Sequence, residues 1–336
     1  MQALLANNLT SFTEFAFDVV RPRVIFKPNW HFEAVTHKLS QVASGEVRRL
    51  IITLPPRTLK SLCASVALPA WFLGRYPWER VLVVSYSEIL ARTHANDFRL
   101  VVNDPIYQAT FPAMRLARDT DREIITTKRG KRIATSIDGT LTGLGGNLII
   151  IDDPLKLGDA MSEAVRARVI EWYRSTLLSR ADDKTEARIV LVMQRVHQDD
   201  LAGYLQEQGG FEVLNLPAIA QRDETYFLGD GRTYDRQKGE LLHPEHEPAV
   251  NICRAVRVAI DKAVDGQMLF QRRNASSGRL GGDTSSFLPA LQPLHPRTGT
   301  DLKAFGRFPP RCSRNHRLKQ THAQVQRTGF RHHRAP

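Results

Sequence analysis

Short apolar runs alternate with longer amphipathic segments through the first two thirds of the chain. The apolar runs predict buried strands near 50–54, 80–86, 147–151, 187–193 and 211–216. Helical spacing predicts a helical lead over 1–25 and helices near 32–42, 62–72, 87–102, 162–179 and 194–209. Residues 124–127 and 132–135 predict a hairpin around Gly130. Strands that alternate with helices predict an α/β fold, with a mainly parallel sheet and helices on both faces.

The stretch 50–72 has the order strand, tight loop, helix. The diproline Pro55-Pro56 ends the strand because neither residue can donate to a sheet ladder. Lys60-Ser61 then precedes the helix. Phosphate-binding loops share this order: backbone amides hold anionic oxygens, the lysine reaches the terminal phosphates and the hydroxyl binds Mg²⁺. Leu54 and Leu59 replace the usual glycines, so this stretch alone also fits a plain strand–turn–helix with a surface lysine.

A second candidate is the acidic pair Asp152 and Asp153, which directly follows the apolar run 147–151. Both carboxylates then lie at the carboxyl edge of the sheet, where open α/β folds bind ligands. A structural interpretation has Asp152 capping the following turn. A catalytic one has Asp152 holding the Mg²⁺ that bridges nucleotide phosphates, while Asp153 orients or deprotonates the attacking water. Lys60 and the acidic pair each supply half of one mechanism, which favours ATP hydrolysis.

Three stretches together resemble the large terminase subunit of tailed bacteriophages and prophages, the ATP-driven DNA-packaging motor. They are LPPRTLKS at 54–61, GTLTGLG at 139–145 leading into IIIDDP at 149–154, and VMQRVHQDDLAG at 192–203. The likeness covers about residues 20–250. It implies a P-loop ATPase of the additional-strand class that uses ATP and Mg²⁺. It also implies double-stranded DNA, a portal protein and a small terminase subunit as partners, a homo-oligomeric ring, and the cytoplasm of a bacterial host.

The same resemblance implies a role for individual residues. The nucleotide-binding loop would comprise Pro56, Arg57, Thr58, Leu59, Lys60, Ser61 and Leu62. Lys60 would bind phosphate, and Ser61 would bind Mg²⁺. Arg57 would sense or stabilise the γ-phosphate, with a plain surface arginine as the alternative.

The resemblance also assigns roles beyond the loop. Asp152 would be the second metal ligand, and Asp153 would be catalytic at a position where many relatives carry Glu. Gln194 would couple hydrolysis to domain movement. The turn 26–31 is expected to pack either on adenine or in the core. His197 and Asp199-Asp200 are expected to cap a helix and lie at the surface rather than act in catalysis.

The net charge of +12 belongs to one end of the chain. Residues 251–336 hold 13 Arg and 3 Lys against 4 Asp and no Glu, whereas the first 250 residues are neutral overall. The scattered Cys63, Cys253 and Cys312 predict a reducing compartment without a disulfide framework. No apolar run is long enough to span a membrane, and the N-terminus lacks the basic region of a secretory signal.

These observations predict a helical lead over 1–45, an ATPase domain over 46–225, a linker over 226–250 and a basic tail over 251–336. The tail lacks the carboxylates of a nuclease domain, so DNA cleavage is expected to be absent. The tail is either an out-of-frame segment or a disordered basic arm that binds phosphates. Alternatives remain: an inactive prophage remnant, a non-enzymatic basic nucleic-acid-binding protein, or a helicase-like ATPase, which would need a second domain.

Overall fold

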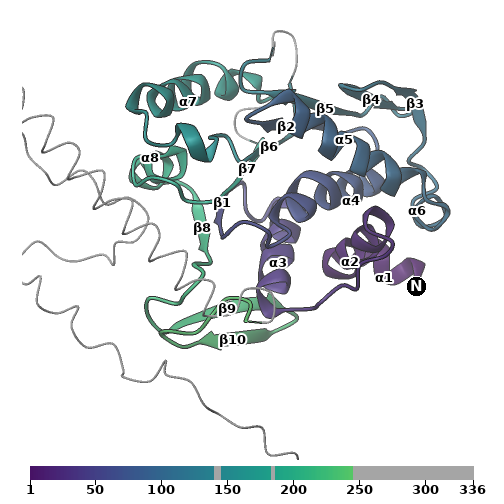
Figure 1. Cartoon of the computed structure of the whole chain (residues 1–336). Coiled ribbons are helices and arrows are strands. Elements are labelled where there is room, and N and C mark those ends of the chain that lie inside the picture. Colours follow the sequence, from purple (N-terminus) through teal and green to yellow (C-terminus); the bar gives the residue numbers. More distant parts are fainter. Residues whose placement is uncertain (140–144, 183–185, 245–336) are drawn as a thin grey trace, which may run out of the picture. The chain divides into compact units, whose positions relative to one another are not determined.

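The computed structural model describes residues 1–139, 145–182 and 186–244, and the statements below concern these residues (Figure 1). They all belong to one compact unit. Most of the glycine-rich stretch 139–145 and the whole predicted tail 251–336 lie outside the described residues. None of the described helices is both long and apolar enough to cross a bilayer.

An eight-stranded sheet organises the described residues. In spatial order its strands are β3 (Leu116–Asp119), β4 (Glu123–Thr126), β5 (Lys131–Ser136), β2 (Arg80–Ser85), β6 (Leu148–Asp152), β7 (Arg188–Met193), β1 (Arg49–Thr53) and β8 (Glu212–Asn215). Strands from β5 to β8 in this order pair in parallel, whereas β3, β4 and β5 pair antiparallel. Because β7 lies between β1 and β6, the sheet has the strand order of the additional-strand class. The predicted α/β fold and the hairpin around Gly130 are confirmed.

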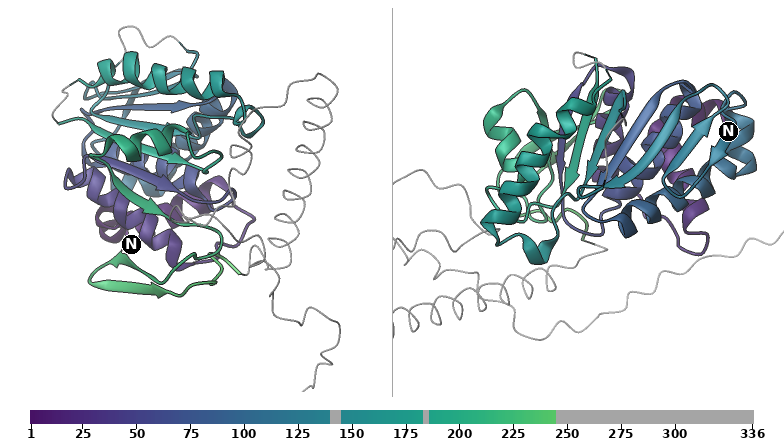
Figure 2. Two further views of the ribbon diagram at one scale, coloured as in Figure 1. Left: turned by 90° about the vertical axis from the view of Figure 1, so that its left-hand side faces the viewer. Right: turned by 90° about the horizontal axis from the view of Figure 1, so that it is seen from above.

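Helices cover both faces of this sheet (Figure 2). The α-helices are α1 (Gln2–Asn7), α2 (Leu9–Val20), α3 (Trp30–Ser44), α4 (Leu68–Arg75), α5 (Glu88–Asn103), α6 (Pro105–Thr110), α7 (Glu163–Ser175) and α8 (Leu201–Gln208). A π-helix, η1 (Leu62–Ala67), leads directly into α4, and two short 3₁₀ turns are η2 (Leu157–Asp159) and η3 (Leu177–Arg180). Helices α1 to α6 with η1 share one core, and α7 and α8 share the other.

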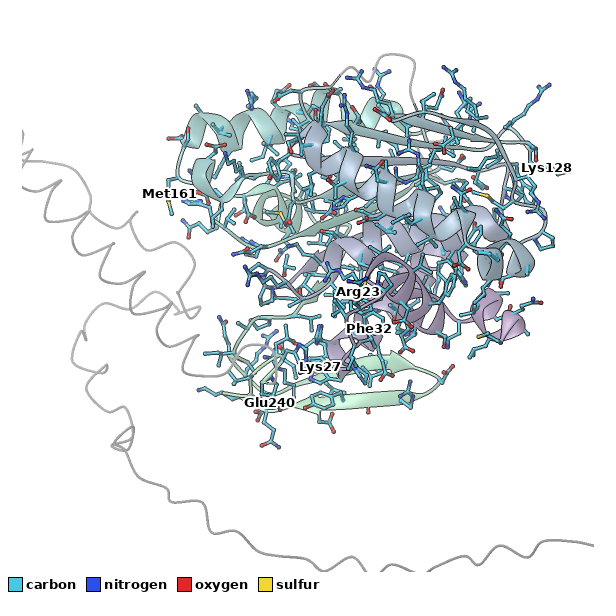
Figure 3. The ribbon with its side chains drawn as sticks, turned by 45° about the vertical axis from the view of Figure 1, so that its right-hand side comes forward. Arg23, Lys27, Phe32, Lys128, Met161 and Glu240 are labelled. Atoms are coloured by element: carbon cyan, nitrogen blue, oxygen red, sulfur yellow. The ribbon has the colours of Figure 1, made fainter. Side chains whose placement is uncertain are left out.

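The central strands read as continuous apolar runs because both of their faces are buried. Along β6, Ile149 and Ile151 pack with α7 and α8, whereas Ile150 packs with η1, α4 and α5. The helical lead is part of the same core: Phe12 of α2 contacts Tyr107 and Phe111 edge-on. Figure 3 contrasts buried Phe32 on α3 with Lys128, which points outward from the β4–β5 turn.

The helix predicted from 194 begins only at Leu201, so that prediction is wrong over 194–200. The reason is Asp200, whose buried carboxylate caps α8 through the Gly203 amide at 2.9 Å. It also accepts the amide of Val196 at 3.1 Å and the guanidinium of Arg195 at 3.1 Å. The expected helix cap is confirmed, but Asp200 is buried rather than at the surface.

The strand predicted at 211–216 is not the last one. A hairpin of β9 (Glu224–Gly229) and β10 (Arg232–Arg236) follows, and it occupies much of the described part of the predicted linker. Its strands lack an apolar run because one side faces solvent. The available signal was the Asp230-Gly231 pair, since both residues take positive φ, as a two-residue hairpin turn requires.

We predict that Gly203→Ala destabilises the protein. A Cβ at this position would lie 1.8 Å from the carbonyl oxygen of Gln198, so the 194–200 loop would have to move. Overpacking of this kind costs about 1–3 kcal/mol, which thermal unfolding would detect. Gly158→Ala is the matched control, because its Cβ would meet nothing within 4 Å. An equal effect of the two substitutions would contradict the prediction.

Candidate nucleotide-binding site

The candidate site lies where three parallel strands end together. Thr53 at the end of β1 pairs with Met193 at the end of β7, and Asp152 at the end of β6 pairs with Val192. The loop 54–59 follows β1, and the π-helix η1 follows that loop. Parallel strands therefore bring the predicted phosphate-binding loop and the predicted acidic pair to one edge of the sheet.

Two contacts join the loop to the acidic pair across more than 90 residues of sequence. The Lys60 ammonium lies 2.9 Å from Oδ2 of Asp153. The Ser61 hydroxyl donates to Oδ1 of Asp152 at 3.0 Å. The structure thus brings together the four side chains that the sequence predicted to converge.

The loop backbone is strained at two non-glycine positions. Arg57 and Leu59 have φ of 62° and 63°, a left-handed conformation that costs an L-residue about 1–2 kcal/mol. Leu59 stands where the usual pattern has glycine, and it adopts the conformation that glycine would adopt. The Thr58 hydroxyl closes the turn by donating to the Pro55 carbonyl at 2.7 Å. The loop therefore keeps its sharp turn without the glycine.

The other loop residues differ in what they present. Leu62 is buried in the core, so its side chain is not available to a ligand. Pro56 and Arg57 are exposed, and no hydrogen bond or ion pair joins Arg57 to another residue in the described ranges. The structure therefore places Arg57 on the loop but does not bring its side chain to the acidic pair.

Asp153 is held by the strand beside it. Its own amide donates to the Val192 carbonyl at 2.9 Å, and its Oδ1 accepts the backbone amide of Gln194 at 3.1 Å. The residue has φ of 46°, so the chain turns sharply straight after β6. Gln194 is therefore next to the acidic pair, but the contact uses its backbone and not its side-chain amide.

Asp152 is fully buried, and its second oxygen has its own partners. Ser65 of η1 donates to Oδ2 at 2.7 Å, and Nδ1 of His94 on α5 lies 3.4 Å from the same oxygen. Sequence reasoning missed both residues. Ser65 lies four residues after Ser61, so it shares a helix face with it, which was an available signal. Nothing near His94 in the sequence pointed to this contact.

Burial dominates the electrostatics here. It raises the pKa of Asp152 to about 7, and the charge of Asp153 adds to the rise, whereas hydrogen bonds from Ser65 and Ser61 and the Lys60 ammonium oppose it. Burial also lowers the pKa of His94 to about 4, helped by the nearby Arg132 guanidinium. His94 is therefore neutral at pH 7, while the Asp152 carboxyl is poised between its two protonation states.

The turn 26–31 is expected to pack either on adenine or in the core, and the contacts of Trp30 bear on this choice. The Trp30 ring stacks on Tyr234 with centroids 4.4 Å apart and planes 7° apart, and Tyr226 lies 5.0 Å away. The Arg236 guanidinium lies 5.6 Å from the same ring. These contacts match the core-packing alternative, in which the hairpin β9–β10 covers Trp30.

The donor set at the strand ends fits a magnesium ion. Ser61 and Asp152 offer hard oxygen atoms, and Mg²⁺ in nucleotide-binding proteins typically uses one or two carboxylates together with substrate phosphates. In the described part of the chain, no cluster of three or more His, Cys, Asp or Glu forms a self-contained metal cage. A site of this kind would therefore be completed by a nucleotide.

Comparisons with known proteins give structural neighbours only. No protein-family model and no curated protein matches the chain. Among solved structures, the large terminase of bacteriophage HK97 aligns with 13% identity and a TM-score of 0.38 over 61% of this chain and 44% of that chain. The large terminase ATPase domain of a Thermus phage aligns with 14% identity and a TM-score of 0.33, over 53% of this chain and 67% of that chain.

A large terminase from a thermophilic bacteriophage, in complex with ADP, aligns with 10% identity and a TM-score of 0.32 over 53% of this chain and 44% of that chain. The chain therefore matches less than half the length of two of these three neighbours.

We predict that Asp152→Asn stabilises the metal-free protein at alkaline pH. The pKa of Asp152 is about 7 in the folded protein and near 4 in the unfolded chain. The folded state therefore loses stability relative to the unfolded state as the pH rises from about 4 to about 7. The neutral amide avoids this loss of about 1.4 kcal/mol per pKa unit. In EDTA at pH 8, the melting temperature of the variant should exceed that of the wild type by several degrees, since 1 kcal/mol corresponds to about 2–4 °C. Near pH 4.5 the two melting temperatures should be equal. A constant difference across this pH range would contradict the prediction.

Proposed function

We propose that the chain is a Mg²⁺-dependent ATPase and acts as the motor domain of a phage large terminase. One observation supports this most directly: Lys60 lies 2.9 Å from Asp153 while Ser61 lies 3.0 Å from Asp152, at the carboxyl edge of one sheet. A lysine, a hydroxyl and two carboxylates in this arrangement are the parts that phosphoryl transfer requires. The three sequence stretches that resemble terminases supply the narrower assignment.

The Lys60 ammonium can pair with Asp153 or with the phosphates of a bound nucleotide. Without nucleotide its ammonium neutralises Asp153, which is the nearest carboxylate. When ATP occupies the loop, its terminal phosphates offer more negative charge, so the ammonium transfers to them. The backbone amides of 57–62 and the N-terminus of the following helix add further donors to the phosphate oxygens.

Asp153 then serves as the residue that orients the attacking water. The Gln194 amide holds its Oδ1, so Oδ2, which faces Lys60 in this structure, is the oxygen that becomes available. Because Asp is one methylene shorter than the Glu of many relatives, the water must come closer to the strand end. The Gln194 contact also gives β7 a direct link to the catalytic carboxylate, which supports a role for Gln194 in coupling.

Ser61 and Asp152 would hold the Mg²⁺. A bound Mg²⁺ neutralises charge on the phosphate oxygens during phosphoryl transfer. The chain contributes the Ser61 hydroxyl and the Asp152 carboxylate, which lie 3.0 Å apart and have a fixed mutual orientation. Burial keeps this carboxylate away from bulk water, so its interaction with a cation is stronger than at an exposed site.

The partners follow from the resemblance. We propose that ATP hydrolysis moves double-stranded DNA through a portal protein in the cytoplasm of a bacterial host. A small terminase subunit would select the DNA, and several copies of the chain would form a ring.

We predict that Lys60→Ala lowers ATP turnover at least 100-fold, since the variant loses the cation that reaches the phosphates. Release of phosphate by the purified full chain, with Mg²⁺ and with or without DNA, measures this. Lys128→Ala, which removes an exposed lysine on the β4–β5 turn, is the matched control and should retain activity. Equal turnover by wild type and Lys60→Ala would favour a non-enzymatic, nucleic-acid-binding protein instead.

We predict that Arg57→Ala lowers kcat about 100-fold or more while ATP affinity changes little, as for other arginines that act on the γ-phosphate. The exposed guanidinium has no described partner to lose, so folding should not change. Arg23→Ala, at another exposed arginine, is the control. Unchanged kcat in Arg57→Ala would identify Arg57 as a plain surface residue.

A further inference from the structure

The two oxygens of the Asp152 carboxylate have different surroundings. Oδ1 accepts from Ser61 at 3.0 Å, on the side of the phosphate-binding loop. Oδ2 accepts from Ser65 at 2.7 Å and lies 3.4 Å from Nδ1 of His94. The shorter hydrogen bond is thus made to the oxygen that faces the protein interior. Ser65, unlike Ser61, is fully buried, so its hydroxyl is not available to a nucleotide.

The local backbone places Ser65 at this position. It lies within the π-helix η1, in which the Leu68 amide bonds the Cys63 carbonyl five residues earlier. π-Helical turns are rare and occur mostly at functional sites. The Ser65 carbonyl in turn accepts Nη2 of Arg132 at 3.0 Å, so a residue from β5 fixes the same turn.

Arg132 is itself held in place by the core. Its side chain is almost fully buried, and its guanidinium lies 4.9 Å from the centroid of the Phe98 ring on α5. His94 comes from the same helix, one turn before Phe98. Helices α5 and η1 therefore reach one oxygen of Asp152 through the buried side chains of His94 and Ser65, and strand β5 supports Ser65 through Arg132.

We propose that Ser65 is a positioning residue for the metal site. Its hydrogen bond fixes the rotation of the Asp152 carboxylate, so that Oδ1 stays directed toward Ser61 and the bound ion. Nδ1 of His94 lies 3.4 Å from the same oxygen. This inference rests on the proposed ATPase function and deepens it, because it names a residue that tunes the ion without touching it. Partners of this kind alter metal affinity or activity about 10–100-fold when they are removed.

The test separates binding of the ion from binding of the nucleotide. Affinity for the fluorescent nucleotide mant-ADP is measured for the full chain in EDTA and across a MgCl₂ titration. In Ser65→Ala we expect the Mg²⁺ concentration for half-maximal effect to rise about tenfold, while affinity in EDTA stays at the wild-type value. In ATP hydrolysis, the Mg²⁺ requirement should rise in the same proportion.

Thr13→Val is the matched control, because it also removes a buried hydroxyl but one that bonds only the Leu9 carbonyl of its own helix. Its Mg²⁺ titration should equal that of the wild type. Ser65→Cys, which keeps a weak donor at nearly the same volume, should lie between wild type and Ser65→Ala. If Ser65→Ala does not fold, the comparison of Ser65→Cys with wild type decides the question.

The outcomes distinguish the two proposals. A wild-type chain that binds mant-ADP without any effect of Mg²⁺ overturns the proposed function and this inference together. A wild type with a Mg²⁺ effect, beside a folded Ser65→Ala with the same half-maximal concentration, overturns the inference alone. Equal weakening in EDTA and in Mg²⁺ also overturns it, because Ser65 would then support the fold and not the ion.

Discussion

The burial of one carboxylate, Asp152, is the constraint on which the rest of the site depends. An ionised group without solvent is costly unless hydrogen bonds and opposite charge compensate for it. Ser61 and Ser65 each donate to one of its oxygens, and the Lys60 ammonium is near enough to lower its pKa. The compensation is incomplete, because the pKa still rises to about 7. A cation at this edge would complete it, which links the stability of the fold to its ligand.

The strand order of the sheet sets the distance between the loop and the acidic pair. Strand β7 separates β1 from β6, so the loop 54–59 and the acidic pair leave the sheet two strands apart. The side chains of Lys60 and Ser61 reach across that separation to Asp153 and Asp152. The residue that directly follows this strand, Gln194, supplies the amide that holds Asp153. One inserted strand therefore separates the loop from the acidic pair and also contacts Asp153 through the Val192 carbonyl.

Strain in the loop indicates how strongly the surrounding structure determines its shape. Leu59 takes a left-handed conformation that glycine adopts far more easily. It is partly buried, and its side chain packs against the core formed by η1 and α4. This packing offsets some of the backbone cost. A departure from the usual glycine pattern is thus compatible with the usual loop, because tertiary contacts compensate for the unfavourable residue.

The sequence by itself determined the parts that depend on periodicity and on local chemistry. Apolar runs located β1, β2, β6 and β7, and the diproline and the acidic pair marked where two of these strands end. It did not determine the start of α8, because the Asp200 carboxylate is the helix cap and also bonds the backbone of the 194–200 loop, a tertiary arrangement without a periodic signal. The hairpin β9–β10 escaped prediction because its strands are exposed on one side and carry no continuous apolar run. Only the tertiary structure brought Ser65 and His94 to Asp152, because their contacts join segments that are more than 50 residues apart and leave no period in the sequence.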